Sequence, residues 1–271
     1  MFEDRTIGFI GGGNMGEALV RGLLSASLFP AEKIFVYDVS AHRVEHLAAE
    51  YGIRATRSLA EPAQSCDIIL LAVKPQVMPS VLGKLRDHIS GNRLVISIAA
   101  GVPLAMLEAE LPKGTSVVRV MPNTPALVLQ GASALSRGKS VSAEQMKMAL
   151  ALFRAVGKAV EVEEKWMDTV TGLSGSGPAY VLLLIEAMID AGVLMGLPRH
   201  LSRELTVQTF IGASMMLDQA GKHPAEMKDM ITSPGGTTIQ GLKVLEAKGV
   251  RGAVFEAVEA ATRRSEELGK G

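Results

Sequence analysis

The segment IGFIGGGNMGEALVRGL, which begins at Ile7, constrains the fold of this chain more than any other. Its glycines Gly11, Gly13 and Gly16 follow the spacing G-x-G-x-x-G, directly after an apolar run that predicts a strand and before a run that predicts a helix. The first glycine permits a tight turn, the second lets the backbone approach a pyrophosphate, and the third allows close packing of helix on strand. The segment therefore predicts the first strand-turn-helix unit of a dinucleotide-binding domain.

Short apolar runs and amphipathic stretches alternate from residue 6 to about residue 162. The runs predict strands at 6–10, 33–37, 67–73, 93–100 and 116–122, and the stretches predict helices at 14–27, 40–51, 76–87 and 103–111. This alternation is typical of βαβ units, with a mostly parallel sheet and right-handed crossovers. We expect residues 1–162 to form an α/β N-terminal Rossmann-like doubly wound domain.

The strand pattern ends near residue 163, and the rest of the chain predicts helices only. They are expected at 165–172, 178–196, 199–220, 224–230, 238–248 and 251–268. The most apolar run, 178–197, contains Glu186 and Asp190. Two acids at its middle disfavour a membrane span, so we expect a helix buried inside protein. Residues 163–271 are thus predicted to form an all-α domain.

Composition narrows the kinds of partner. Lys plus Arg and Asp plus Glu number 28 each, so the chain has no basic field to hold a nucleic acid. The single cysteine, Cys66, excludes an internal disulfide framework, and the five histidines lack metal-ligand spacing. The first residues show no signal-peptide pattern, which favours the cytoplasm. We expect a small-molecule partner, no metal and no membrane.

Asp38 ends the second predicted strand, 22 residues after Gly16. An acid at this place can accept hydrogen bonds from the adenosine ribose hydroxyls and repels a 2′-phosphate, whereas Ser40, His42 and Arg43 could help bind one. A helix cap or a turn is an equally good interpretation of Asp38. The carboxylate favours tolerance of NADH, and the preference between NADH and NADPH stays open.

Three further strand ends carry small or polar residues, namely Lys74 with Pro75, the segment 99–102 and the segment 121–125. In a parallel sheet, ligands lie beyond the carboxyl ends of the strands. Each segment alone fits an ordinary loop equally well. Three such segments at successive strand ends favour one continuous cleft.

The stretch ITSPGGTTIQG, from Ile231, interrupts the helical half. Pro234 and the glycine pair after it suit a turn, which is the simpler interpretation. However, hydroxyl side chains at Ser233, Thr237 and Thr238 adjoin a loop whose glycines let backbone N–H groups converge before a helix expected from about Thr238. Such a segment suits an anion.

Taken together, the motifs GFIGGGNMG, AVKPQ, SIAAGV, MPNTPALV, GLSGSGPAYV, GLPR, HPAEMKDMITSPGGTTIQGL and AVEAATRRSEEL resemble the pyrroline-5-carboxylate reductase family from about residue 6 to residue 268. The glycine turn is widely shared, but MPNTP, SGSGPAY and SPGGTT together are specific. The resemblance implies reduction of 1-pyrroline-5-carboxylate to L-proline with NADPH or NADH, the last step of proline biosynthesis. It also implies that the helical domain forms a dimer with a second copy, and that dimers often assemble into decamers.

The resemblance also implies site residues by position in these motifs. Those expected to contact the dinucleotide are Gly11, Gly12, Gly13, Asn14, Met15, Asp38, Ala72, Val73, Lys74, Pro75, Ala100, Asn123 and Thr124. Those expected to bind the substrate are Glu164, Ser233, Gly236, Thr237 and Thr238. Thr238 is the best catalytic candidate, since its hydroxyl could donate to the substrate or relay a proton, although a helix cap would explain it as well. Family members mostly prefer NADPH and commonly lack an acid where this chain has Asp38, which puts that preference in doubt here.

Two other hypotheses fit the fold. A related two-domain dehydrogenase or imine reductase should have a lysine or comparable acid–base group on the first helix of the helical domain, where SGSGPAY leads instead to Tyr180 and apolar residues. A non-catalytic dinucleotide-sensing protein would keep the fold but gives no reason for an anion-binding loop.

Overall fold

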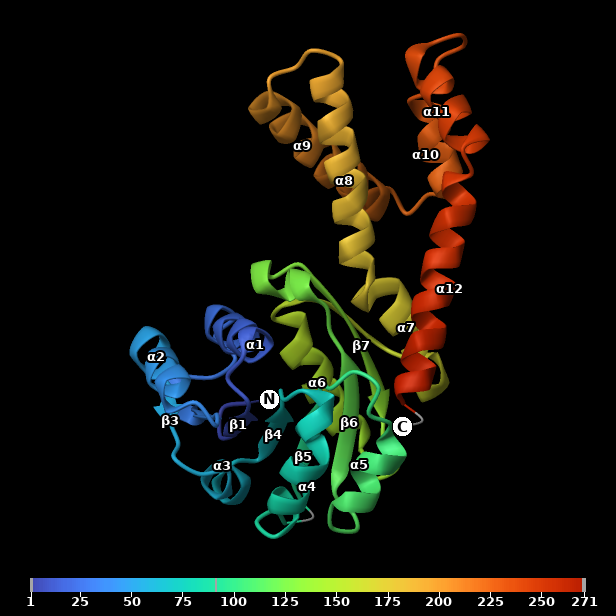
Figure 1. Ribbon diagram of the computed structural model, residues 1–271. Helices are drawn as coiled ribbons and strands as arrows, with labels where there is room; N and C mark the ends of the chain where they lie inside the picture. Colours follow the sequence, from blue (N-terminus) through green and yellow to red (C-terminus); the bar gives the residue numbers. More distant parts are fainter. Residues whose placement is uncertain (1, 91, 270–271) are drawn as a thin grey trace. The chain divides into compact units, whose positions relative to one another are not determined.

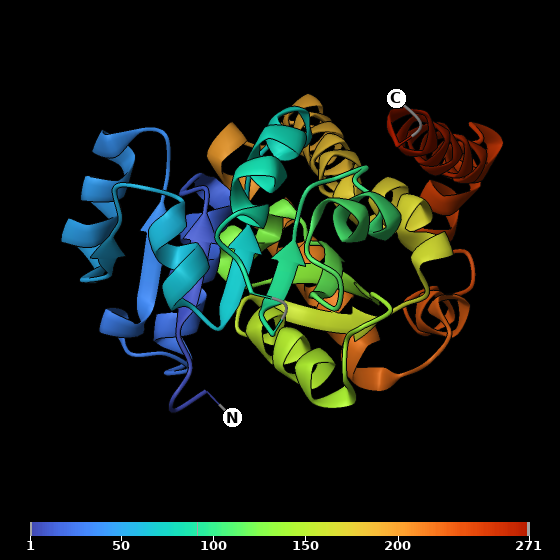
Figure 2. The same ribbon diagram turned by 90° about the horizontal axis from the view of Figure 1, so that it is seen from below.

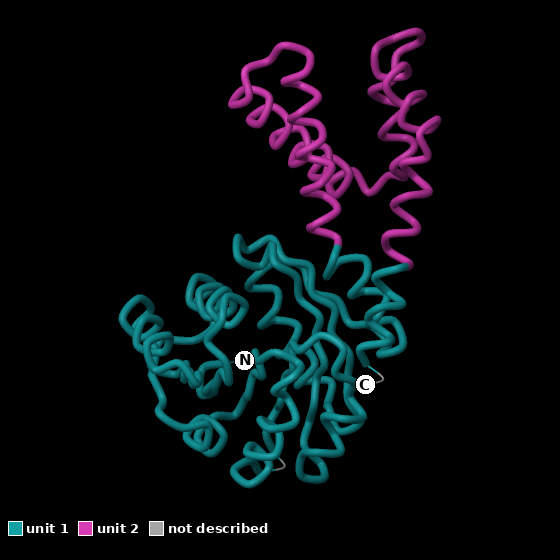
Figure 3. Tube along the Cα trace, viewed as in Figure 1, with its two compact units in different colours: residues 1–176, 260–271 teal, residues 177–259 magenta. Residues whose placement is uncertain are grey.

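The computed structural model describes residues 2–90 and 92–269, and the chain divides into two compact units. The first comprises residues 1–176 with 260–271, and the second comprises residues 177–259 (Figure 3). The strand pattern ends with β8 at Glu161, close to the predicted change at residue 163, but residues 163–176 belong to the same compact unit as the sheet.

An eight-stranded sheet forms the centre of the first unit, in the order β3-β2-β1-β4-β5-β6-β7-β8 (Figure 1). The first six strands are parallel, β7 runs antiparallel to β6, and β8 runs parallel to β7. The order 3-2-1-4-5-6 is that of the doubly wound dinucleotide-binding fold, so the predicted fold class is confirmed. The strands are β1 (Ile7–Ile10), β2 (Ile34–Tyr37), β3 (Arg54–Ala55), β4 (Ile68–Leu71), β5 (Leu94–Ser97), β6 (Ser116–Met121), β7 (Gly131–Arg137) and β8 (Gly157–Glu161).

Helices lie on both sides of this sheet (Figure 2). Along β4 the side chains alternate between two cores: Ile68 and Leu70 pack in the cluster that contains α1 and α6 residues, and Ile69 and Leu71 pack in the cluster that contains α3, α4 and α5 residues. A strand covered on both faces must be apolar at every position, which explains the run IILL. The helices of this layer are α1 (Asn14–Ser25), α2 (Ala41–Tyr51), α3 (Ala60–Ser65), α4 (Met78–Arg86), α5 (Leu104–Glu110) and α6 (Ala143–Arg154).

Short helical turns complete the first unit. The 3₁₀ turns are η1 (Ala31–Lys33), η2 (Pro75–Val77), η3 (Thr124–Val128) and η4 (Glu164–Trp166); α7 (Met167–Val170) and the π-helical turn η5 (Thr171–Gly175) follow. The sequence located neither the short β3 and α3 nor the extents of β7 and α6, because their apolar patterns are short or irregular.

Five helices follow, close to the predicted ranges. They are α8 (Gly177–Leu194), α9 (Arg199–Ala220), α10 (Pro224–Met230), α11 (Thr237–Ala247) and α12 (Val250–Leu268), and the last part of α12 belongs to the first unit. The loop between α8 and α9 turns at Gly196, whose φ of 99° favours glycine. Ser202 Oγ donates to the Ile189 carbonyl (2.7 Å) and Arg199 pairs with Asp190 (2.7 Å), so α8 and α9 form a hairpin.

Helix α8 is not buried in this single chain, and in that respect the expectation for residues 178–197 is wrong. No residue within Gly177–Leu194, all of which the structure describes, is buried. Leu183 is 66% exposed and Leu194 is 85% exposed. The helical stretch Glu164–Leu194 is also long and apolar enough to cross a membrane. A helix that is apolar all round requires an apolar environment, which this chain alone does not supply.

Candidate active site

The glycine turn between β1 and α1 has the shape of a phosphate cradle. Gly11 has a φ of 108°, and a Cβ there would lie 2.5 Å from the Ala72 carbonyl oxygen. A Cβ at Gly16 would lie 2.6 Å from the Gly11 carbonyl oxygen, so both positions require glycine. By contrast, a Cβ at Gly13 would meet no atom within 4 Å. Gly13 is the N-cap of α1, and no side chain in the described part of the chain caps this helix. The open N-terminus therefore fits a pyrophosphate.

Asn14 and Met15 begin α1 at this turn, as the sequence predicts. At the neighbouring strand ends, the Ala72 N–H donates to the Ile10 carbonyl (2.8 Å) and the Ile98 N–H donates to the Leu71 carbonyl (3.1 Å). These bonds bring the ends of β1, β4 and β5 to one edge of the sheet. After β4, Val73 and Pro75 are half-buried, Lys74 is exposed at the start of η2, and Ala100 is exposed after β5.

Asp38 fastens the end of β2 to the glycine turn. Its Oδ2 accepts from the Gly12 N–H (2.7 Å) and its Oδ1 accepts from the Ser40 N–H (2.9 Å). Ser40 caps α2, since its Oγ accepts from the Arg43 N–H (3.4 Å). Asp38 is therefore a turn-forming residue, and each oxygen keeps a further lone pair that a ribose hydroxyl could use.

Arg43 lies beside the same turn. Its Nε donates to the Gly12 carbonyl (2.5 Å), and its guanidinium pairs with the Glu17 carboxylate. The second oxygen of Glu17 accepts from the Tyr51 hydroxyl (2.9 Å). The hydrogen bond from Arg43 is the main cause that lowers the pKa of Glu17, and burial, followed by the bond to Glu17, raises the pKa of Tyr51. The sequence pattern pointed to Arg43 but not to Glu17, which lies in α1, or to Tyr51, which is the last residue of α2.

Asn123 holds the loop after β6. Its Nδ2 donates to the Ser174 carbonyl (3.0 Å), and its Oδ1 accepts from the Ala132 N–H (2.8 Å). The amide thus joins this loop to β7 and η5, while Thr124 is exposed as the first residue of η3. A positioning role for Asn123 follows from this geometry, and contact with a nicotinamide stays a prediction for both residues.

Glu164, the first residue of η4, bonds to the start of α5 and pairs with a buried arginine. Its Oε1 accepts from the Leu104 N–H (2.6 Å) and from Arg119 (3.2 Å), whose side chain is 7% exposed. Asp168 lies 3.9 Å from the same guanidinium and accepts from Ser265 Oγ (2.7 Å). Arg119 was not among the residues expected from the sequence, although a charged residue inside the apolar strand SVVRVM signals a buried partner.

The segment from Ser233 to Thr238 belongs to the second compact unit. Its Gly235 has a φ of 68°, and the Gly236 N–H donates to the Ser233 carbonyl (3.0 Å), which closes a tight turn. Helix α11 begins at Thr237, and Gly236 is its N-cap without a capping side chain. The alternative that Thr238 is a helix cap is therefore wrong, because Thr238 is the second helical residue. The first turn of α11 keeps its N–H groups available for an anion.

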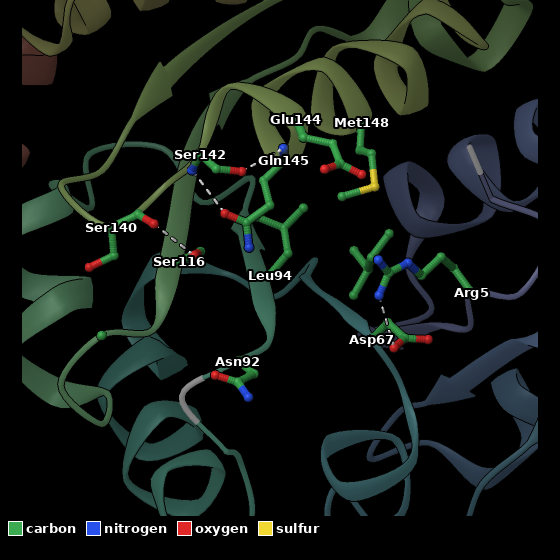
Figure 4. Close-up of a pocket in the computed structure, with 12 residues that line it drawn as sticks. Arg5, Asp67, Asn92, Leu94, Ser116, Ser140, Ser142, Glu144, Gln145 and Met148 are labelled. Atoms are coloured by element: carbon green, nitrogen blue, oxygen red, sulfur yellow. Dashed lines mark hydrogen bonds and ion pairs between the residues drawn. The ribbon is translucent and has the colours of Figure 1, made fainter.

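A separate pocket of about 410 Å³ lies at the opposite ends of the central strands (Figure 4). Ile68, Leu94 and Ser116, which begin β4, β5 and β6, are among its lining residues, and Arg5 pairs there with Asp67. None of the predicted site residues lines this pocket. Within the described ranges, no group of three or more His, Cys, Asp and Glu side chains is placed to hold a metal ion.

Comparison with known proteins identifies the families that this chain resembles. Residues 164–268 match the family model described as pyrroline-5-carboxylate reductase dimerisation, and residues 6–101 match the model described as NADP oxidoreductase coenzyme F420-dependent. The chain is 50% identical over 268 residues to a pyrroline-5-carboxylate reductase of Methanosarcina acetivorans, covering 99% of each.

Two solved structures have the same fold over their full length. The pyrroline-5-carboxylate reductase of Coxiella burnetii superposes with a TM-score of 0.93 at 36% identity, covering 98% of this chain and 99% of that one. The pyrroline carboxylate reductase of Plasmodium falciparum, solved with NADP bound, superposes with a TM-score of 0.89 at 38% identity, covering 99% of this chain and 100% of that one. Full-length similarity at this level, together with the shared dimerisation region, establishes the family. The chain belongs to the pyrroline-5-carboxylate reductase family.

Proposed function

We propose that this chain reduces 1-pyrroline-5-carboxylate to L-proline with NADPH or NADH, the last step of proline biosynthesis. The observation that carries the proposal is a glycine N-cap at two helix N-termini, neither of which is capped by a side chain. One follows the glycine turn at Gly13, and the other, at Gly236, is followed by two threonines. The first suits a pyrophosphate, and the second suits the carboxylate of a small substrate. The relatives named above carry this activity in their names.

The reaction requires little acid–base chemistry from the protein. A bound reduced nicotinamide would supply the hydride. A cyclic imine is more electrophilic when its nitrogen is protonated, and it can take that proton from water. The chain's main task is therefore to hold the imine carbon in place through the substrate carboxylate. We propose that Ser233, the Gly236 turn, Thr237 and Thr238 bind that carboxylate, with the Thr238 hydroxyl closest to the ring nitrogen.

Glu164 receives a different proposed role. Its Oε1 is already shared by the Leu104 N–H and Arg119. We propose that it orients Arg119 and the start of α5, and that any contact with the substrate uses its remaining oxygen. The dinucleotide residues named from the sequence stay part of this proposal, with Asp38, Ala72 and Asn123 acting partly through the loops they shape.

A second copy of the chain is the proposed partner of α8. Its exposed leucines would be costly in water, and the dimerisation model covers the whole helical region. Asp190, in the apolar stretch, pairs with Arg199 at the surface, and such charges would be expensive in lipid. We therefore propose a homodimer rather than a membrane anchor, and further assembly of dimers into a decamer in the cytoplasm. Mass photometry at nanomolar concentration tests the assembly, and a monomeric protein would contradict it.

Turnover provides the direct test. Purified protein should oxidise NADH or NADPH only when 1-pyrroline-5-carboxylate is added. Thr238→Val should raise the KM for the imine about 10- to 100-fold, since a charge-assisted hydrogen bond contributes roughly 1.5–3 kcal/mol. Thr209→Val in α9, where the hydroxyl only donates to the Leu205 carbonyl, is the matched control. Nucleotide binding without turnover of the imine would favour a non-catalytic sensing protein, and turnover of another substrate alone would favour a related dehydrogenase.

A further inference from the structure

Arg43 is the first Lys or Arg after β2 in the sequence, and its charge is paired within the chain. Arg43 donates through Nε to the Gly12 carbonyl (2.5 Å) and pairs with the Glu17 carboxylate. The Arg43 and Glu17 side chains are only 26% and 25% exposed. Tyr51 donates its hydroxyl to the other Glu17 oxygen (2.9 Å). The guanidinium is thus held by α1 and by the glycine turn, and Glu17 is held in turn by α2.

This cluster occupies the place where the fold distinguishes the two dinucleotides. In a doubly wound domain, the residues after the second strand face the adenosine ribose, where an acid accepts from the 2′-hydroxyl and an arginine accommodates a 2′-phosphate. In this chain Asp38 and Arg43 secure opposite sides of one residue: Asp38 accepts from the Gly12 N–H (2.7 Å), and Arg43 donates to the Gly12 carbonyl. The acid and the arginine are both used to shape the turn.

The balance of charge is unfavourable for a phosphate. A phosphate monoester carries a charge of roughly −1.5 to −2 at neutral pH. It would approach two carboxylates, Asp38 and Glu17, and one guanidinium that is already paired. Two of the five guanidinium donors are used by Glu17 and the Gly12 carbonyl, so Arg43 could offer a phosphate only its remaining N–H groups, at the position that these two partners fix. NADH, which has a hydroxyl in place of the phosphate, needs none of these groups.

We propose that Glu17 is a specificity-determining residue: by pairing with Arg43 it keeps the guanidinium from a 2′-phosphate, so that this chain binds NADH more tightly than NADPH. The inference rests on the proposed nicotinamide site. It adds that the preference is set from α1, by a residue outside the loop that follows β2.

Glu17→Gln tests the proposal with little change in shape. The amide oxygen can still accept from Tyr51, but the negative charge is lost and Arg43 becomes available. We expect the ratio of the Kd for NADPH to the Kd for NADH to fall about 10-fold or more, because Arg43 can then form one charge-assisted hydrogen bond to the 2′-phosphate. Tyr51→Phe, which only loosens Glu17, should shift the ratio in the same direction by less. Adding Arg43→Leu to Glu17→Gln should abolish the improvement in NADPH binding.

Glu45→Gln is the matched control, because Glu45 is an exposed acid of the same helix as Arg43 and its replacement removes the same charge. Both Kd values are measured by nucleotide fluorescence titration on the folded protein without substrate, so the readout does not depend on turnover. Tighter binding of NADPH than NADH by the wild type, or an equal shift in Glu17→Gln and Glu45→Gln, would overturn the inference. Preferential NADH binding without imine reduction would support it while refuting the proposed function.

Discussion

Replacing Glu164 by alanine should unfold the first unit at a markedly lower temperature. The change removes the acceptor of the Leu104 N–H (2.6 Å) and the nearer partner of Arg119 (3.2 Å). Arg119 is 7% exposed and would keep only Asp168, at 3.9 Å. An arginine left so poorly paired in the interior cannot recover its hydration, which is the physical source of the cost.

The magnitude follows from the burial of the two partners. Breaking a buried ion pair by removing one member costs roughly 3–5 kcal/mol. Since Glu164 is 36% exposed and Asp168 remains, we expect the lower end, about 3 kcal/mol. For a unit of this size, 1 kcal/mol corresponds to roughly 2–4 °C, so Tm should fall by about 6–12 °C.

Thermal unfolding followed by circular dichroism at neutral pH measures the effect. Glu163→Ala is the matched control, because this neighbour pairs with Lys165 (2.7 Å) on the surface, where the two side chains are 61% and 65% exposed. Such a pair contributes about 0–1 kcal/mol. If both variants lower Tm equally, Arg119 does not depend on Glu164 and the reasoning is refuted. Glu164→Gln keeps an acceptor for the Leu104 N–H and should lose less stability than Glu164→Ala. If Glu164→Gln raises the KM for the imine without a change in Tm, Glu164 contacts the substrate directly.

Three further predictions concern other parts of the chain. Leu183→Glu, at an exposed apolar position of α8, should convert the proposed dimer to monomers in light scattering, whereas a dimer of unchanged stability would place the interface elsewhere. Burial raises the pKa of the Cys66 thiol to about 12, so iodoacetamide at pH 8 should modify it only after unfolding, as mass spectrometry would show. Arg43 lowers the pKa of Glu17, so Glu17→Gln should reduce the free energy of unfolding at neutral pH, and this reduction should shrink as the pH falls below 4.5, the ordinary pKa of a glutamate. A reduction that stays constant from pH 7 to 3 would contradict this.

Much of the architecture could be predicted from local pattern. The run IILL and its neighbours identified parallel strands, because a strand covered on both faces is apolar throughout. The glycine spacing located the tight turn between β1 and α1, since Gly11 and Gly16 have no room for a Cβ. The ends of α8 to α12 lay near the predicted breaks, because Gly196 and Gly221, with positive φ, mark places where the backbone leaves the helix.

The partners of individual side chains could not be predicted in the same way. Arg119 and Glu164 are 45 residues apart, and Arg43 and Glu17 are 26 apart. No local periodicity links such positions. The hydroxyl of Thr238 fitted either a cap or a binding role; the backbone geometry at Gly236 excluded the cap, and the binding role stays a prediction.

By itself, the sequence determined most of the strands and helices in chain order, the place of the glycine turn and the family of the chain, because these depend on residue types at short spacing. Only the tertiary structure decided what the charged residues do. It placed Asp38 on the Gly12 N–H, Arg43 on Glu17 and Arg119 on Glu164, and it left α8 exposed in the single chain. The physical reason is that hydrogen bonds and ion pairs depend on distances of about 3 Å between side chains from different elements, and those distances exist only after the elements have packed.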